Sequence, residues 1–202
     1  MPGYFAVLTI VLMLGMIAAR VLLLKRQGTK AMKFGDIDKK DFLIPPFALF
    51  YFYMVFASAL GFPAPSTARI FHSELLSWAG VGTCLAGLGL LLWSLISFGK
   101  SFRVGIDTRR PDKLVTNGIF AHSRNPIYVA FALILIGEFL IFSDWILLTY
   151  IGAAAWLFHR QVLREEEYLE KHYGQEYTDY RNRVRRYLGV FAYPRKNHQS
   201  RL

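Results

Sequence analysis

Five apolar stretches, nearly free of charged residues, constrain the fold of this chain more than any other feature. They occupy residues 4–24, 42–62, 75–98, 126–142 and 145–159. A helix needs about 20 apolar residues to cross the hydrocarbon of a bilayer, with a range of roughly 17–25. The first three stretches meet that length, and the last two, separated only by Ser143 and Asp144, predict a tight helical hairpin. The sequence therefore predicts an all-α integral membrane protein with five transmembrane helices.

The distribution of cations predicts how these helices are oriented. The polar segments 25–41, 63–74, 99–125, 143–144 and 160–202 carry six, one, six, zero and ten Lys or Arg residues, so that rich and poor segments alternate. By the positive-inside rule the N-terminus lies outside, whereas the basic loops and the C-terminal tail lie in the cytoplasm. The net charge of +10 then faces anionic membrane lipids, and nucleic-acid binding is not expected.

Particular side chains in the apolar stretches predict how the helices pack. Gly82 and Ala86, four residues apart in the third stretch, predict the close approach of another helix. Glu138 in the fourth stretch is costly in lipid, so it must face protein or water, and we interpret it as a polar tie between helices toward the outer side. The single cysteine, Cys84, excludes an intrachain disulfide, and its place in an apolar stretch favours a packing role.

The C-terminal tail has the pattern of an amphipathic helix. One face carries the apolar and aromatic residues Leu169, Tyr173, Tyr177, Tyr180 and Val184 at helical spacing, with charged residues elsewhere. This face is expected to dock on the inner surface of the membrane. Gly174 interrupts the pattern and predicts a break or bend in the helix.

A polar loop ending in Arg124, Asn125 and Pro126 leads directly into the fourth apolar stretch. Asn and Pro suit the cap and the first position of a helix, because the Asn side chain accepts an otherwise unpaired N–H and Pro has none to lose. The free N–H groups and the positive end of the helix dipole then face the membrane surface, where they favour an anionic group. A second polar block, at residues 165–180, begins with three consecutive glutamates.

Together the two polar blocks resemble the isoprenylcysteine carboxyl methyltransferase and phospholipid methyltransferase family of membrane enzymes, over roughly residues 95–188. The first family motif, Leu-Val-x-x-Gly-x-Tyr and then Arg-His-Pro-x-Tyr, is similar to residues 114–120 and 124–128. The second motif is similar to Glu165-Glu166, Leu169, Tyr173-Gly174, Glu176-Tyr177, Tyr180 and Val184-Arg185-Arg186. The order, the spacing and the membrane context agree for both motifs.

The resemblance implies S-adenosyl-L-methionine as cofactor and a lipophilic small molecule or lipid as the membrane-embedded methyl acceptor. The residues similar to the family's cofactor contacts are Asp112, Lys113, Leu114, Val115, Phe120, Asn125, Pro126, Ile127, Tyr128 and Glu165. Catalytic roles are expected for Arg124, Tyr128 and Glu166, and contact with the acceptor for Gln161 and Arg164. Arg124 suits the cofactor carboxylate, and the adjacent glutamates suit its ammonium or ribose hydroxyls.

The same resemblance divides the chain into two parts. Residues 1–98 are expected to form three N-terminal transmembrane helices, and residues 99–202 the cofactor-binding loop, the two-helix hairpin and the amphipathic tail. We expect the protein in a prokaryotic inner membrane.

Four positions depart from the family pattern. Asn125 stands where the family has His, Phe120 where it has Tyr, and Asp112 replaces a His that often precedes the Leu-Val pair. Gln161 stands where isoprenylcysteine enzymes place an Arg that contacts substrate. A neutral amide cannot neutralise a buried carboxylate, so Gln161 favours another acceptor, such as an amine headgroup, unless a neighbouring arginine takes that role.

Two other functions remain open at the level of sequence. A membrane reductase that uses a nicotinamide cofactor would have a similar architecture, and a non-catalytic membrane protein could retain the scaffold. The departures at Gln161 and Asn125 are the main support for the non-catalytic protein. A metal site is not predicted, because the five histidines are scattered and no Cys/His cluster has the spacing of metal ligands.

The alternation of cations yields a prediction about topology. Reporter fusions at the two ends of the chain should place the N-terminus outside and the C-terminus in the cytoplasm. Five spans require opposite sides, so reporters found on the same side would contradict the five-span arrangement.

Overall fold

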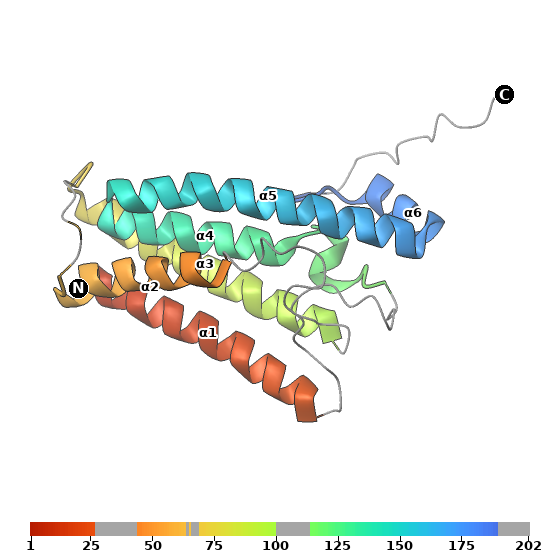
Figure 1. Cartoon of the computed structure of the whole chain (residues 1–202), viewed down its shortest axis with the longest axis horizontal. Coiled ribbons are helices and arrows are strands. Elements are labelled where there is room, and N and C mark those ends of the chain that lie inside the picture. The colour runs from red at the N-terminus through yellow and green to blue at the C-terminus, as the bar shows by residue number, and fades with distance from the viewer. Residues whose placement is uncertain (27–43, 64, 66–68, 100–113, 190–202) are drawn as a thin grey trace.

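The computed structural model describes residues 1–26, 44–63, 65, 69–99 and 114–189, and this part of the chain is helical throughout its regular structure. The elements are α1 (Pro2–Arg26), α2 (Ile44–Leu60), α3 (Glu74–Phe98), the 3₁₀ helix η3 (Gly118–Ala121), α4 (Pro126–Phe142), α5 (Trp145–Tyr173) and α6 (Gln175–Arg183). Helices α1 to α5 lie side by side along the long axis, and α6 follows the far end of α5 (Figure 1). The predicted all-α class is confirmed for these residues.

Three of the five long helices are long and apolar enough to cross a membrane. Helices α1, α3 and α5 contain 25, 25 and 29 residues, whereas α2 and α4 contain 17 residues each. Large apolar side chains such as Leu75, Ile96 and Trp156 are exposed on these helices, as lipid-facing side chains are. The protein is therefore an integral membrane protein, and the full count of five spans stays a prediction because α2 and α4 are at the lower limit of length.

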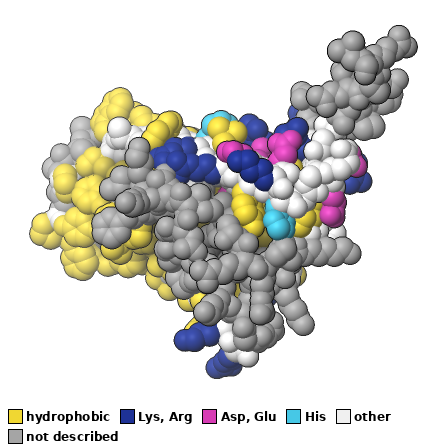
Figure 2. All heavy atoms as spheres, turned by 45° about the vertical axis from the view of Figure 1, so that its right-hand side comes forward, with side chains coloured by type: hydrophobic (Ala, Val, Ile, Leu, Met, Phe, Trp, Pro, Cys, Tyr) yellow, Lys and Arg dark blue, Asp and Glu magenta, His cyan; other side chains and the backbone are white. Residues whose placement is uncertain are grey.

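The two ends of the bundle differ in polarity. The end of α1, the end of α3 and the start of α4 lie at the same end of the molecule as α6 (Figure 1). Side chains of both charges gather toward this polar end, and hydrophobic side chains cover the other (Figure 2). The basic segments after α1 and α3 therefore begin at the same, polar end of the bundle. This is the arrangement expected when successive helices alternate in direction. Which side of the membrane that end faces remains a prediction.

The predicted helical hairpin is present, with Ser143 and Asp144 as its turn. Ser143 has a φ of 48°, and its Oγ donates to the carbonyl oxygen of Phe71 at 2.7 Å. Asp144 caps α5, because its Oδ1 accepts from the backbone N–H of Ile146 at 2.6 Å. Two short polar residues thus reverse the chain and begin the next helix.

Helices α3 and α4 approach one another closely through Gly80 and Gly137, which were not among the predicted contact residues. A Cβ atom added at Gly80 would lie 2.5 Å from the carbonyl oxygen of Gly137, and one added at Gly137 would lie 2.5 Å from Cys84 Sγ. At Gly82 an added Cβ would meet nothing within 4 Å, and Ala86 is exposed. The prediction of Gly82 and Ala86 as the contact was wrong, since two residues turn a helix by about 200° and place Gly82 on the outer face.

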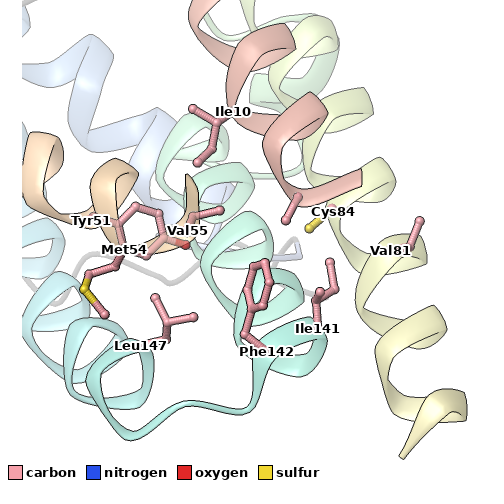
Figure 3. Packing of buried hydrophobic residues seen from close by; sticks show 10 residues of the cluster. Ile10, Tyr51, Met54, Val55, Val81, Cys84, Ile141, Phe142 and Leu147 are labelled. Carbon is pink, nitrogen blue, oxygen red and sulfur yellow. The ribbon is translucent and has the colours of Figure 1, made fainter. Parts of the chain in front are cut away.

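Buried side chains from all five long helices form the apolar core. Figure 3 shows Ile10 of α1, Tyr51 of α2, Cys84 of α3, Phe142 of α4 and Leu147 of α5 meeting in this cluster. The polar tie predicted for the fourth stretch is confirmed, because the Tyr51 hydroxyl of α2 donates to the fully buried Glu138 of α4.

The tail contains the predicted helical face, but this face covers protein rather than membrane. Gly174, with a φ of 52°, breaks the chain between α5 and α6 as predicted. Tyr177, Tyr180 and Val184 are buried in a cluster with Leu114, Leu169 and Tyr173. The Tyr180 hydroxyl donates to the carbonyl oxygen of Phe120 at 2.7 Å. The expected docking of this face on the membrane was wrong, because the rings pack on Leu114 of the loop before α4 and the Tyr180 hydroxyl donates to a loop carbonyl.

The contact between α3 and α4 predicts opposite effects for two glycines of one helix. We expect Gly80→Ala to destabilise the protein by about 1–3 kcal/mol through overpacking. Gly82→Ala, the matched control, should be neutral or stabilising by up to about 1 kcal/mol, since alanine favours a helix more than glycine does. Thermal unfolding in detergent measures both variants, and equal melting temperatures would refute the close contact at Gly80.

Candidate active site at the start of α4

The loop before α4 is fixed against the end of α3 by Gly118. This residue has a φ of 59°, and a Cβ added there would collide with the side chain of Ser97. The Ser97 Oγ accepts from the backbone N–H of Ile119 at 3.3 Å, and the Phe120 ring packs on Phe98 with centroids 4.5 Å apart. The glycine of the first motif is therefore required by the backbone conformation and by the close approach to α3.

The start of α4 departs from the predicted capping arrangement. Pro126 occupies the first helical position and Asn125 the cap position, as expected, but the Asn125 side chain makes no capping hydrogen bond. Its Nδ2 instead donates to Glu166 Oε1 at 3.2 Å and to the carbonyl oxygen of Arg186 at 3.1 Å. The amide is drawn to a charged acceptor, which gives a stronger hydrogen bond than a neutral one. The prediction of an Asn125 side-chain cap was therefore wrong.

Glu166 of α5 lies between two arginines from other segments. Arg124 Nη1 approaches Glu166 Oε1 at 3.2 Å, and these two side chains are only 7% and 9% exposed. Arg186 donates through Nε to Oε1 at 3.2 Å and to Oε2 at 3.1 Å, and through Nη2 to Oε2 at 3.0 Å. Arg124 Nη1 also donates to the Tyr177 hydroxyl at 3.1 Å. We name Arg124, Asn125, Glu166, Tyr177 and Arg186 the charge cluster.

The charge cluster holds one carboxylate against two guanidinium groups, so its net charge is positive. Burial, helped by the nearby Glu166 carboxylate, raises the pKa of Tyr177 to about 12. The hydrogen bonds to Glu166 raise the pKa of Arg186 above its ordinary value. At neutral pH, Tyr177 is therefore a neutral hydrogen-bonding partner and Arg186 a permanent cation.

The neighbouring Glu165 has a different environment. Its Oε1 accepts from the Tyr128 hydroxyl at 2.6 Å and from Gln161 Nε2 at 3.2 Å, and all three residues are half-buried. The Tyr128 ring in turn lies against Phe158, with centroids 5.6 Å apart. Adjacent glutamates point about 100° apart on a helix, which explains why two consecutive carboxylates acquire such different partners. We name Tyr128, Gln161 and Glu165 the acidic pocket group.

The structure brings six of the fourteen predicted site residues into these two groups, namely Arg124, Asn125, Tyr128, Gln161, Glu165 and Glu166, and places others in packing roles. Phe120 is buried beneath the loop, Pro126 is buried in the first turn of α4, and Ile127 packs on the core between α3 and α4. Leu114 packs on the tyrosines of the tail, and Val115 and Arg164 are half-buried. Asp112 and Lys113 lie outside the described residues.

Three residues that the sequence analysis did not assign to the site contribute to it: Ser123, Tyr177 and Arg186. The Ser123 Oγ accepts from the backbone N–H of Asn125 at 3.1 Å and shapes the entry into α4. Arg186 belongs to the basic stretch that ends the second motif. This basic stretch was the available signal of a partner for the paired glutamates, but the sequence could not show which cation meets which carboxylate.

The charge cluster predicts a large difference between adjacent glutamates. Glu166→Ala should cost about 3–5 kcal/mol of unfolding free energy, because it leaves the buried Arg124 without its carboxylate. Glu167→Ala should not change the melting temperature measurably, since Glu167 pairs with Lys171 on the surface, with side chains 66% and 74% exposed. Thermal unfolding in detergent compares the two, and similar melting temperatures would show that the cluster does not stabilise the fold.

Comparison with known proteins gives these groups a family context. A sequence model of the family named phospholipid methyltransferase matches residues 75–176, about half of the chain. The chain is 28% identical over 123 residues to Protein-S-isoprenylcysteine O-methyltransferase of Schizosaccharomyces pombe, covering 59% of this chain and 52% of that protein. For the proteins of the same name from Tribolium castaneum and Rattus norvegicus, the identities are 30% over 112 residues and 32% over 124 residues.

These matches cover 54% of this chain and 40% of the Tribolium castaneum protein, and 57% of this chain and 44% of the Rattus norvegicus protein. The chain thus spans about half the length of the curated relatives it matches. The match to the family extends from the start of α3 into α6 and includes both the loop before α4 and the paired glutamates of α5. On this ground the chain belongs to the phospholipid methyltransferase family.

Proposed function

We propose that this protein transfers a methyl group from S-adenosyl-L-methionine to a lipophilic acceptor embedded in the membrane. The observation that carries the proposal is the contact between the two sequence motifs, which lie about forty residues apart in the chain. Arg124 meets Glu166 at 3.2 Å, and Tyr128 meets Glu165 at 2.6 Å. Membership of the family, and relatives named O-methyltransferases, support methyl transfer as the reaction.

The residues at the start of α4 fit the charges of the cofactor. S-adenosyl-L-methionine has a carboxylate, an ammonium and a sulfonium group. The net positive charge cluster beside the N-terminal end of α4 suits the carboxylate. The Arg124 Nε is buried and has no hydrogen-bond partner within the described part of the chain, as expected of a donor that awaits an acceptor. Glu165, which accepts from Tyr128 and Gln161, suits the ammonium or the ribose hydroxyls.

The two glutamates then have separate roles in the proposed reaction. When bound, the cofactor supplies an electrophilic methyl group on its sulfonium, open to in-line attack. The site contributes mainly by aligning the two reactants and excluding water. Glu165 is the better candidate of the two to contact the reactants, because Glu166 is already engaged by two arginines. We assign Glu166 to holding Arg124 and the start of α4 in position.

The surroundings of Gln161 favour an amine over a carboxylate as the acceptor group. Gln161 donates to Glu165, so this part of the site combines a neutral amide with a negative charge. The guanidinium of the preceding Arg160 lies over the Trp156 ring, 5.6 Å from its centroid. An incoming carboxylate would meet repulsion from Glu165, whereas an ammonium headgroup would be attracted. The names of the relatives instead suggest an isoprenylcysteine as the acceptor. An experiment can distinguish the two acceptors.

Cofactor binding tests the proposal directly. Calorimetry in detergent should show binding of S-adenosylhomocysteine with micromolar affinity, about −8 kcal/mol. Glu165→Ala should weaken that binding by about 1.5–3 kcal/mol, through loss of a charged hydrogen bond. Glu167→Ala, on the exposed face of the same helix, is the matched control and should bind as the wild type does.

The acceptor is identified with radiolabelled cofactor and two lipids. Label should appear on phosphatidylethanolamine, and base-labile label on farnesylcysteine instead would reject the amine while leaving methyl transfer intact. Absence of cofactor binding would favour a non-catalytic protein, and binding of a nicotinamide nucleotide in its place would favour a reductase.

A further inference from the structure

The segment after α6 returns to the loop that precedes α4. The backbone N–H of Gly189 donates to the carbonyl oxygen of His122 at 2.9 Å, and that of Arg124 donates to Arg185 at 3.1 Å. A third hydrogen bond, from the N–H of Arg185 to Gly189 at 3.0 Å, closes the turn between them. Residues 184–189, which we name the return segment, are thus held to the loop by backbone contacts that do not depend on side-chain identity.

The return segment is also joined to α5. His159 Nδ1 lies 2.7 Å from the Tyr187 hydroxyl, and Arg186 donates to both oxygens of Glu166, through Nε to Oε1 at 3.2 Å and through Nη2 to Oε2 at 3.0 Å. The segment therefore bridges the loop and the helix that carry the two motifs. The match to the family ends at residue 176, ten residues before Arg186.

Arg186 contacts the start of α4 in two ways at once. Its guanidinium donates to both oxygens of Glu166, and its carbonyl oxygen accepts from Asn125 Nδ2 at 3.1 Å. With both oxygens fixed, Glu166 presents Oε1 to Arg124 in one direction only. Lysine cannot reproduce this arrangement, since an ammonium is a point charge and lacks the planar fork of a guanidinium.

We infer that Arg186 is a positioning residue of the active site, which orients Glu166 and thereby Arg124 toward the carboxylate of the cofactor. This inference rests on the proposed function and gives a role in the site to a residue that lies ten positions beyond the end of the family-model match. Arg186 does not touch the reactants in this scheme. Its side chain is 35% exposed, whereas that of Arg124 is only 7% exposed.

The experiment compares Arg186→Ala and Arg186→Lys with the control Arg183→Ala. Arg183 is exposed, and its Nε donates to the carbonyl oxygen of Asp179 within its own helix. We expect Arg186→Ala to weaken S-adenosylhomocysteine binding by about 10- to 100-fold, the range for losing a charged hydrogen bond, and Arg183→Ala to leave it unchanged. Arg186→Lys should recover only part of the loss.

Steady-state kinetics separates positioning from general stability. The KM for the cofactor should rise in Arg186→Ala at temperatures well below its melting point, while the KM for the acceptor stays near the wild-type value. Arg186→Lys serves for the same measurement if the alanine variant does not fold.

The possible outcomes are distinct. If the wild type binds S-adenosylhomocysteine and Arg186→Ala binds it within twofold as well, the inference is overturned and the proposed function stands. A lysine variant with wild-type affinity and only a lower melting temperature would make Arg186 merely structural, and would also overturn it. A wild type that binds no S-adenosylhomocysteine would overturn the proposed function, and the inference with it.

Discussion

The polar end of this protein depends on one buried carboxylate. Glu166 forms an ion pair with Arg124 and accepts hydrogen bonds from Asn125 and Arg186. These residues come from the loop before α4, the start of α4 and the return segment after α6. A carboxylate buried without partners would cost several kcal/mol, so its presence in α5 requires these segments to converge on it. The contact thus does more than stabilise the fold, because it determines where the loop, the helix start and the tail lie relative to one another.

This convergence needs a rigid base, which the packing of α3 against α4 provides. Glycines on both helices allow the backbones to approach until Gly80 and Gly137 are in contact. The same close approach brings Ser97 near the end of α3 to Gly118, where only a glycine fits. Apolar packing in the bundle therefore determines where the loop before α4 crosses the end of α3. The charge cluster is formed next to this crossing.

Two adjacent glutamates divide the tasks of the proposed site. Glu166 is buried and held by cations, whereas Glu165 is half-buried and held by the neutral groups of Tyr128 and Gln161. A carboxylate already neutralised by arginines is a poor proton acceptor and a good anchor. The helical turn of about 100° between consecutive residues is enough to give Glu166 its proposed positioning role and Glu165 its proposed contact with the reactants.

The sequence by itself determined the helices, because their signals are local. The apolar stretches, the Ser143-Asp144 turn, Pro126 at the first position of α4 and the break at Gly174 each follow from the residues at that place. The tertiary structure decided which faces meet. The contact between α3 and α4 is at Gly80 and not at Gly82. The tyrosines of the tail pack on the loop rather than on the membrane, and the Asn125 amide donates to Glu166 instead of capping a helix. Arg186 illustrates the reason: twenty residues separate it from Glu166, and only the turn at Gly174 and the return of the chain to His122 bring the two charges together.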